Sequence, residues 1–131
     1  MAVGLATVPL ANKWLDTPHT AGGAAFGPVA TYIKLHTADP GGTAVTAPSA
    51  NVTRVVATLG NASGGAIAIT GTNPVWTNGG TGETLSHISV WDAITAGNLL
   101  WTAAITTPQA WASGNTFTLT SLGMSLAPLA A

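Results

Sequence analysis

The sequence predicts an all-β protein, an antiparallel β-sandwich or jelly roll with a short N-terminal helix, in a single domain over residues 1–131. Between residues 28 and 126, apolar and polar residues repeatedly alternate with a period of two, as in half-buried strands. Turn residues interrupt this pattern at a spacing of roughly 8–12 residues, which is typical of sandwiches. A chain of 131 residues is long enough for one core but short for two.

The one helix is expected over residues 7–16. Pro9 suits its first turn, because the N–H that proline lacks would have no partner there. Leu10 and Trp14 follow four residues apart and so share one face. Pro18 ends the helix, since proline disfavours helical geometry in the residue before it.

The first strand of the alternating region is expected at residues 32–37. Ile33 and Leu35 face one way there, while Lys34 and His36 face the other. The turn sequence D-P-G-G follows directly. Further strands are expected at residues 52–59, 66–70, 75–77, 85–92, 99–105 and 116–122, with the last run or a second strand reaching toward 126.

Residues 85–92 form the clearest long strand, and both of its faces carry apolar groups. Strict alternation places Leu85 and Trp91 on one face and Ile88 and Val90 on the other. A strand with two apolar faces is expected to be covered on both sides, by a second sheet and by a partner chain or the helix.

Charged residues are scarce. The chain has three Lys or Arg and four Asp or Glu, with a net charge of −1, and none follows Asp92. Such a chain lacks the clustered basic residues of nucleic-acid binding proteins. It also lacks the charge repulsion that keeps free proteins apart. We therefore expect a homo-oligomer, with a trimer as its expected state, and no nucleic-acid partner.

Several other classes of protein are also disfavoured. The chain has no Cys, which excludes disulfides, thiolate metal sites and thiol nucleophiles. Polar residues interrupt the uncharged residues 93–131 too often for a membrane span. The N-terminus lacks the basic flank and apolar run of a secretory signal, so we expect a soluble protein made in the cytoplasm of its host cell.

Catalytic arrangements can be drawn from the few ionisable residues, but none is convincing. Glu83 and Asp92 would be the two carboxylates of a glycosidase, yet nine positions separate them, which places them on opposite faces of a regular strand. Ser86 or Ser89 with His87 and Asp92 could form a Ser-His-Asp arrangement, but no G-x-S-x-G motif is present. We assign no catalytic residues and expect no enzymatic activity.

A metal site is not expected either. His36 and Asp39 could converge through the turn between them, with His19 or His87 as a third ligand. No H-x-x-x-H or similar spacing supports this arrangement. The better interpretation is that these are polar strand and loop residues, and neither a metal nor a cofactor is expected.

The tryptophans suggest burial in the core or between subunits. Trp101 is in phase with its apolar neighbours and is expected in the core. Trp14 is a candidate subunit contact. Trp111 follows Pro108 in an expected loop, where an exposed ring would offer a platform to a neighbouring chain or to a sugar. Gln109 and Asn115 would be its polar partners.

Five segments of the chain resemble a known group of proteins. They read MAVGLAT at 1–7, LANKWLD at 10–16, YIKLHTADPG at 32–41, TLSHISVWD at 84–92 and TFTLTSL at 116–122. Together they are similar to small virion proteins of tailed bacteriophages that infect actinobacteria, members of which are described as tail-fibre-like or minor tail proteins. The resemblance implies a structural role in the virion and brings no catalytic residues with it.

The function expected from these observations is that of a phage virion structural protein, a tail-tip or tail-fibre-like minor tail component that acts by packing against its own copies and other virion proteins. A capsid decoration protein on the head is one alternative. A carbohydrate-binding module that recognises a host surface glycan through Trp111 is another. A glycoside hydrolase using Glu83 and Asp92 is the most distant one.

Overall fold

The computed structural model describes residues 4–5 and 30–125, so the helix expected over 7–16 lies outside the described residues. All regular secondary structure in the described part is β-strand. The strands are β1 (Gly4–Leu5), β2 (Thr31–His36), β3 (Val55–Ala57), β4 (Ala66–Ala68), β5 (Val75–Thr77), β6 (Glu83–Trp91), β7 (Leu99–Trp111), β8 (Thr116–Thr118) and β9 (Gly123–Ser125).

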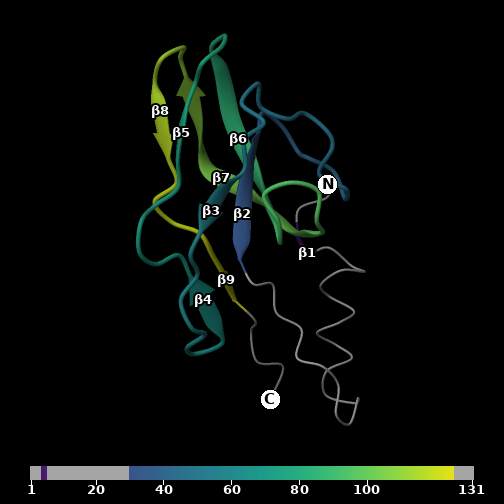
Figure 1. Ribbon diagram of the computed structural model, residues 1–131, viewed down its shortest axis with the longest axis vertical. Coiled ribbons are helices and arrows are strands. Elements are labelled where there is room, and N and C mark those ends of the chain that lie inside the picture. Colours follow the sequence, from purple (N-terminus) through teal and green to yellow (C-terminus); the bar gives the residue numbers. More distant parts are fainter. Residues whose placement is uncertain (1–3, 6–29, 126–131) are drawn as a thin grey trace.

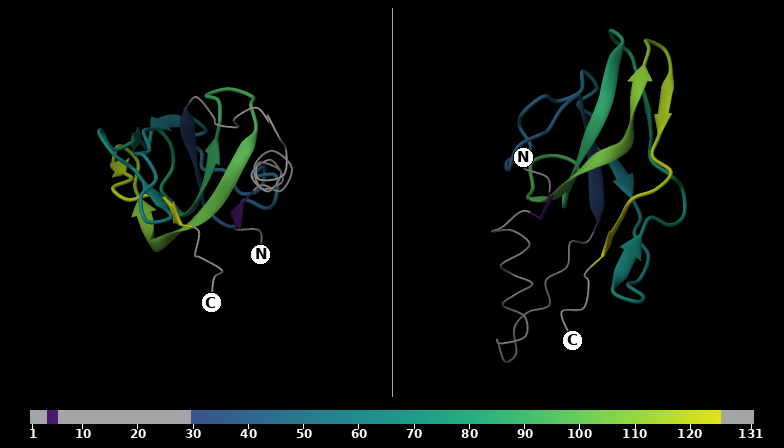
Figure 2. Two further views of the ribbon diagram at one scale, coloured as in Figure 1. Left: turned by 90° about the horizontal axis from the view of Figure 1, so that it is seen from below. Right: turned by 180° about the vertical axis from the view of Figure 1, so that it is seen from behind.

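These strands form three antiparallel sheets (Figure 1). The large sheet has five strands in the order β1-β7-β6-β2-β3, and two small sheets pair β4 with β9 and β5 with β8. The small sheets follow one another along the long axis of the molecule, with β5 and β8 toward one end and β4 and β9 toward the other (Figures 1 and 2). The expected all-β, antiparallel class is confirmed.

The core lies between the large sheet and the small ones. Ile33 and Leu35 of β2 pair with Val90 and Ile88 of β6, and all four side chains are fully or almost fully buried. Trp101 joins them from β7, as its phase predicted. The opposite layer contributes three more side chains, Trp76, Leu119 and Leu122. Full burial of a Leu, Ile or Val side chain contributes about 1.5–3 kcal/mol to stability. The packing of these side chains between the two layers therefore holds the layers together.

A bulge corrects the expected faces of β6. Leu85 pairs with Gln109, whereas His87 pairs with Ala104, so residues 105–108 of β7 lie opposite Ser86 alone. The shift turns Leu85 onto the core face, where it is fully buried, instead of the face of His87. The same stretch contains Pro108, whose missing N–H is tolerated where the ladder is interrupted.

One more expectation about an element differs from the structure. The strand expected at 99–105 continues to Trp111, because it resumes pairing with β6 after the bulge. The expected run from 116 toward 126 is a pair of strands, β8 and β9, which was one of the two possibilities, and each pairs with a different partner. The turn expected at D-P-G-G is present, and Gly41 there has a φ of 73°.

Candidate functional site

Glu83 and Asp92 do not form a catalytic pair. They lie at opposite ends of β6, where each carboxylate accepts hydrogen bonds from a neighbouring loop. The hydroxyl of Ser49 and the backbone N–H of Ala50 (3.1 Å) donate to Glu83. Asn98 donates to Asp92 through its backbone N–H (2.6 Å) and its side-chain amide (2.8 Å). The arrangement fixes loops and leaves no pair of carboxylates facing a common cleft.

The Ser-His-Asp arrangement is not assembled either. Ser86 and His87 are hydrogen-bonded neighbours, with 2.9 Å between Ser86 Oγ and His87 Nδ1. The carboxylate of Asp92, however, is engaged by Asn98. Ser89 is fully buried and belongs to a different network.

That network centres on His36, on the face of the large sheet opposite the core. His36 Nδ1 donates to the Thr46 carbonyl oxygen (3.0 Å), which leaves Nε2 to accept from the Ser89 hydroxyl (2.8 Å). The Trp91 indole N–H donates in turn to Ser89 Oγ (2.9 Å). The chain of bonds suits a neutral His36 with its proton on Nδ1.

The surroundings of His36 lower its pKa below the usual value. Burial disfavours the charged imidazolium and is the largest cause, and the nearby charges of Lys34 and His87 act in the same direction. The hydrogen bond to the Thr46 carbonyl opposes these effects. His36 is therefore a structural residue held in its neutral form.

Asp39, the other residue considered as a metal ligand, forms a turn. One of its carboxylate oxygens accepts from the backbone N–H of Gly41 at 2.9 Å. Within residues 4–5 and 30–125, no three His, Asp or Glu side chains are grouped closely enough to hold a metal ion. His19 lies outside the described residues.

The expectation that Trp111 is an exposed loop residue is wrong. Trp111 is the last residue of β7, pairs with Glu83 and is only 2% exposed. Its indole N–H donates to the Asn115 carbonyl oxygen at 2.9 Å, so the buried ring keeps its polar group satisfied. Gln109 and Asn115 are exposed, but the ring that they were to accompany faces the core. Trp14 lies outside the described residues.

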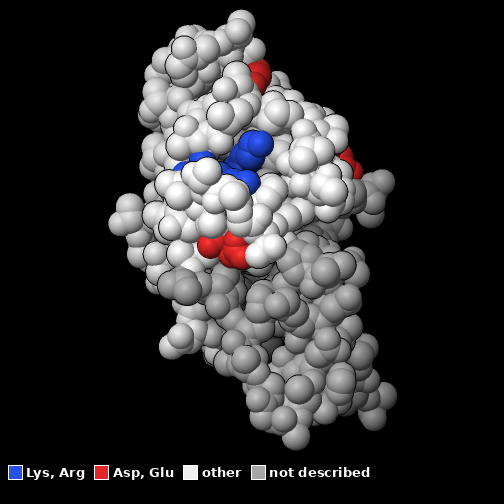
Figure 3. Space-filling model, turned by 45° about the vertical axis from the view of Figure 1, so that its right-hand side comes forward, with Lys and Arg blue, Asp and Glu red and all other residues white. Residues whose placement is uncertain are grey.

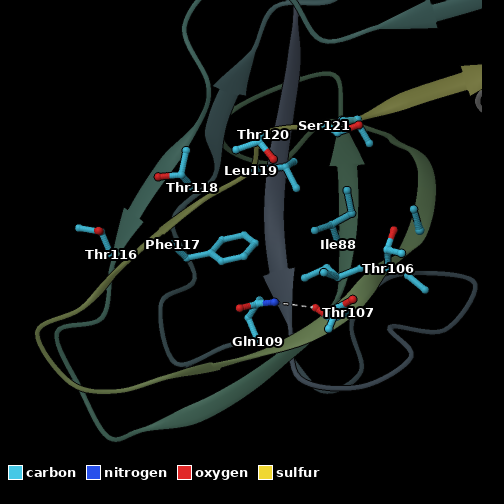
Figure 4. Close-up of a pocket in the computed structure, with 14 residues that line it drawn as sticks. Ile88, Thr106, Thr107, Gln109, Thr116, Phe117, Thr118, Leu119, Thr120 and Ser121 are labelled. Atoms are coloured by element: carbon cyan, nitrogen blue, oxygen red, sulfur yellow. Dashed lines mark hydrogen bonds between the residues drawn. The ribbon is translucent and has the colours of Figure 1, made fainter.

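A groove of about 470 Å³ lies between β7 and the segment 116–122. Its inner wall is apolar and includes Ile88, Ile105, Phe117 and Leu119. Figure 4 shows the Phe117 ring reaching into the space toward Ile88, while the Thr118 side chain points away. Exposed hydroxyl and amide side chains form the rim: Thr106, Thr107, Gln109, Thr116, Thr118, Thr120 and Ser121. None of the lining residues is charged.

The groove lies beside strand edges that have few partners in the described part of the chain. β7 pairs with β6 on either side of the bulge at 105–108, whereas on its other edge it pairs with β1 only at Trp101 and Thr102. β8 pairs only with β5. The groove is thus an opening between the two layers, where the edge of one strand faces the edge of another.

Sequence reasoning missed this groove, although part of its signal was present. The alternation of Thr116, Phe117, Thr118 and Leu119 predicts one apolar and one hydroxyl face. What the pattern cannot give is the bend of β7 at residues 105–108, since the bend depends on a bulge in pairing with a distant strand.

Two comparisons bear on the identity of the chain. A family model described as podophage GP4 fiber I protein gp80 matches residues 6–127. No curated protein matches the sequence. Within the residues that the structure describes, no helix has the length and hydrophobicity required to cross a membrane.

Proposed function

Because the chain belongs to the family of the podophage GP4 fiber I protein gp80, we propose that it is a minor tail component. The family makes it a fibre-type structural protein of a phage virion, and in our proposal it works by packing against further copies of itself. The proposed assembly is a homotrimer, and the proposed protein has no enzymatic activity. The resemblance of its sequence segments adds the proposal that the phage infects an actinobacterium.

The observation that carries this proposal is the uncharged groove between β7 and β8. An unpaired strand edge presents backbone N–H and C=O groups that another chain can pair with. Monomeric proteins commonly protect such edges with charged side chains, especially Lys. Along this groove every lining residue is uncharged, so nothing repels an incoming strand.

We propose that a strand of a second copy occupies the groove. Main-chain hydrogen bonds to the free edge would supply affinity, as in other cases of strand addition. Apolar side chains of the incoming strand would cover Phe117 and Ile105, which are only partly buried in the single chain. The exposed threonine hydroxyls of the rim offer further hydrogen bonds.

Sedimentation velocity at micromolar concentration tests this proposal. The wild-type chain is expected to sediment at three times its own mass of 13.0 kDa. Thr106→Lys and Thr120→Lys each place a charge at the rim of the groove, and each is expected to weaken assembly by about tenfold or more, which corresponds to about 1.4 kcal/mol.

Thr43→Lys is the matched control, because Thr43 is also exposed but lies in the turn after Asp39, away from the groove. Assembly of this variant should equal that of the wild type. A compact wild-type monomer at micromolar concentration would contradict the proposal, and so would equal assembly of all three lysine variants.

The placement in a tail fibre has a separate test in the intact particle. A fibre or tail-tip component is expected in few copies, set by threefold or sixfold symmetry. Quantitative mass spectrometry of purified virions measures this number directly. Hundreds of copies in each particle would instead support the capsid decoration role.

A further inference from the structure

A second hollow, of about 390 Å³, brings together two cations on the face of the molecule shown in Figure 3. Its lining comes from β2, from the residues that precede β3, and from the turn between β6 and β7. The lining residues are Lys34, Val52, Thr53, Arg54, Ile94, Thr95 and Ala96. The whole chain has only three Lys or Arg residues, and two of them meet here.

The strand register places these two positive charges side by side. Ile33 pairs with Val55 in the antiparallel ladder of β2 and β3, so Lys34 has Arg54 as its next neighbour. Like charges opposite each other destabilise a sheet. The pKa of Lys34 is lowered, mainly by burial and also by the positive charge of Arg54, so the two cations repel each other.

Arg54 is held rigidly at the site. Its guanidinium lies 3.7 Å from the centre of the Trp91 ring, and Nη1 donates to the carbonyl oxygens of Ala93 (2.9 Å) and Ala96 (2.5 Å). These bonds use one nitrogen only. Nη2 and Nε make no hydrogen bond within the described part of the chain and so keep their donors for a ligand.

Among the described residues, no acidic side chain forms an ion pair with Lys34 or Arg54. The charge of Asp92 favours the charged form of Arg54, but the hydrogen bonds of its carboxylate come from Asn98. The Lys34 side chain makes no ion pair or hydrogen bond with the described residues. The two cations therefore form a candidate site for an oxyanion, of the kind that Arg and Lys recognise through charge-assisted hydrogen bonds.

The rest of the lining indicates what carries the oxyanion. Val52 and Ile94 are large apolar residues that remain 62% and 59% exposed beside the cations. Thr53 and Thr95 place hydroxyl groups among them. A ligand that has both hydroxyl groups and an apolar ring face would match these apolar and hydroxyl side chains. The volume of the hollow lies within the range of about 300–1,000 Å³ for small-molecule sites.

We propose that this hollow, which we call the Lys34–Arg54 site, binds an acidic sugar: a single monosaccharide unit that carries a carboxylate or a phosphate. The oxyanion lies between the two cations, the apolar ring face lies against Val52 and Ile94, and the threonine hydroxyls bond the sugar hydroxyls. The site is separate from the groove at β7, and it does not depend on the proposed assembly.

Titration of the full-length protein, followed by NMR or calorimetry at constant ionic strength, tests the proposal. The probes are glucuronate, glucose 6-phosphate, neutral glucose and inorganic phosphate. At least one of the two acidic sugars is expected to saturate the site at a few millimolar or below, since a Kd of 1 mM corresponds to about −4.1 kcal/mol. Glucose is expected to bind at least about tenfold more weakly, and the stronger acidic sugar identifies the oxyanion.

Lys34→Gln is expected to weaken binding by about tenfold or more. Lys13→Gln is the matched control, because it removes the same charge from the only other lysine of the chain. The affinity of this variant for the acidic sugar should equal that of the wild type. Arg54→Lys keeps the charge but loses the planar fork, so it should also weaken binding. A circular dichroism melt of each variant separates a binding defect from unfolding.

Three outcomes would overturn the proposal. The first is the absence of saturable binding of either acidic sugar up to about 10 mM, well above the expected Kd. The second is an equal loss of affinity in Lys13→Gln and Lys34→Gln, which would show only general charge attraction. The third is binding of inorganic phosphate as tightly as the sugars, which would show that the sugar ring is not recognised.

Discussion

At the scale of single residues, several polar side chains that were candidates for catalysis or metal binding instead form hydrogen bonds that stabilise the fold. One such network, on the face of β2 and β6 opposite the core, joins His36, Ser89 and Trp91. Among the described residues, no buried side-chain nitrogen or oxygen lacks a partner. A buried network in which every polar group is hydrogen-bonded favours one arrangement of the strands, because another arrangement would leave some of these groups without partners.

The His36 network predicts a pH-dependent stability. Because the pKa of His36 is lowered in the folded protein, the unfolded chain binds more protons at mildly acidic pH. The free energy of unfolding is therefore expected to be greatest above about pH 6.5, the usual value for histidine, and to fall as the pH decreases from there toward the lowered pKa. Urea unfolding between about pH 7.5 and 5 measures this slope.

His36→Gln should flatten the slope between pH 7.5 and 5, whatever its effect on stability at neutral pH. His87→Gln is the control, since His87 is only partly buried and bonds to its neighbour Ser86. An unchanged slope in His36→Gln would show that another group causes the pH dependence.

Trp111 gives a second prediction at this scale. Its ring is buried and its N–H is bonded to Asn115, so Trp111→Ala removes a core side chain and leaves a cavity. The expected cost is about 3–5 kcal/mol in the free energy of unfolding, measured by chemical denaturation. Gln109→Ala, two residues away and exposed, should change stability by less than about 0.5 kcal/mol. Near-wild-type stability of Trp111→Ala would contradict the burial.

The sequence could not place Trp111 at the end of a strand. Pro108 suggests a loop, and it breaks the alternation that would otherwise have continued β7 to its end. The phase of Trp111 depends on the bulge opposite Ser86, a contact between residues that are far apart in the chain. Ile33, Leu35 and Trp101 were predicted correctly, because their strands are regular over the residues concerned.

At the scale of elements, the turn between β6 and β7 connects the hairpin to the Lys34–Arg54 site. Asp92 and Asn98 close the turn by hydrogen bonds, and Arg54 bonds two carbonyl oxygens within it. Ala96 and Gly97 have φ values of 53° and 72°, two successive left-handed residues within the connection of residues 92–98.

Gly97→Ala is expected to destabilise this turn. An added Cβ would meet the carboxylate of Asp92 and would lie 2.7 Å from Ala93 Cβ, and the left-handed backbone alone costs about 1–2 kcal/mol for a residue with a Cβ. The loss of thermal stability measured by circular dichroism should therefore correspond to at least that amount. Gly42→Ala, where an added Cβ meets nothing within 4 Å, should leave stability nearly unchanged. Equal stability of the two variants would contradict the crowded geometry.

The limits of prediction at this scale have a physical cause. Strand existence follows from local alternation, and the expected strands near 32–37, 66–70, 75–77 and 85–92 are present. Partners do not follow from alternation. The uniform run of threonine and apolar residues from Thr116 gives no indication that β8 and β9 belong to different sheets.

At the scale of the whole molecule, the scarcity of charge has different consequences at the two surfaces. The groove at β7 has no charged lining residue, whereas the Lys34–Arg54 site concentrates two of the three cations of the chain. Both features lie outside what composition can predict, because composition counts charges without placing them. The placement depends on strand register and on the packing of the two layers.

This contrast predicts opposite responses to salt. Assembly through an uncharged groove should be unaffected when sodium chloride is raised from about 0.05 to 0.5 M, because screening acts on charges alone. Binding of an acidic sugar at the Lys34–Arg54 site should weaken over the same range. Sedimentation velocity and ligand titration at each salt concentration measure the two effects. Dissociation of the oligomer at high salt would show that charged residues form its interface.

The two small sheets share one feature that concerns the order in which the protein forms. β4 and β5 precede β6 and β7 in the chain, but their partners β9 and β8 follow β7 and both lie in residues 116–125. β2 and the hairpin of β6 and β7 therefore leave the ribosome before the partners that complete the small sheets. The second layer can close over the core only after residue 125 has emerged, so the nascent chain exposes its apolar sheet face until then.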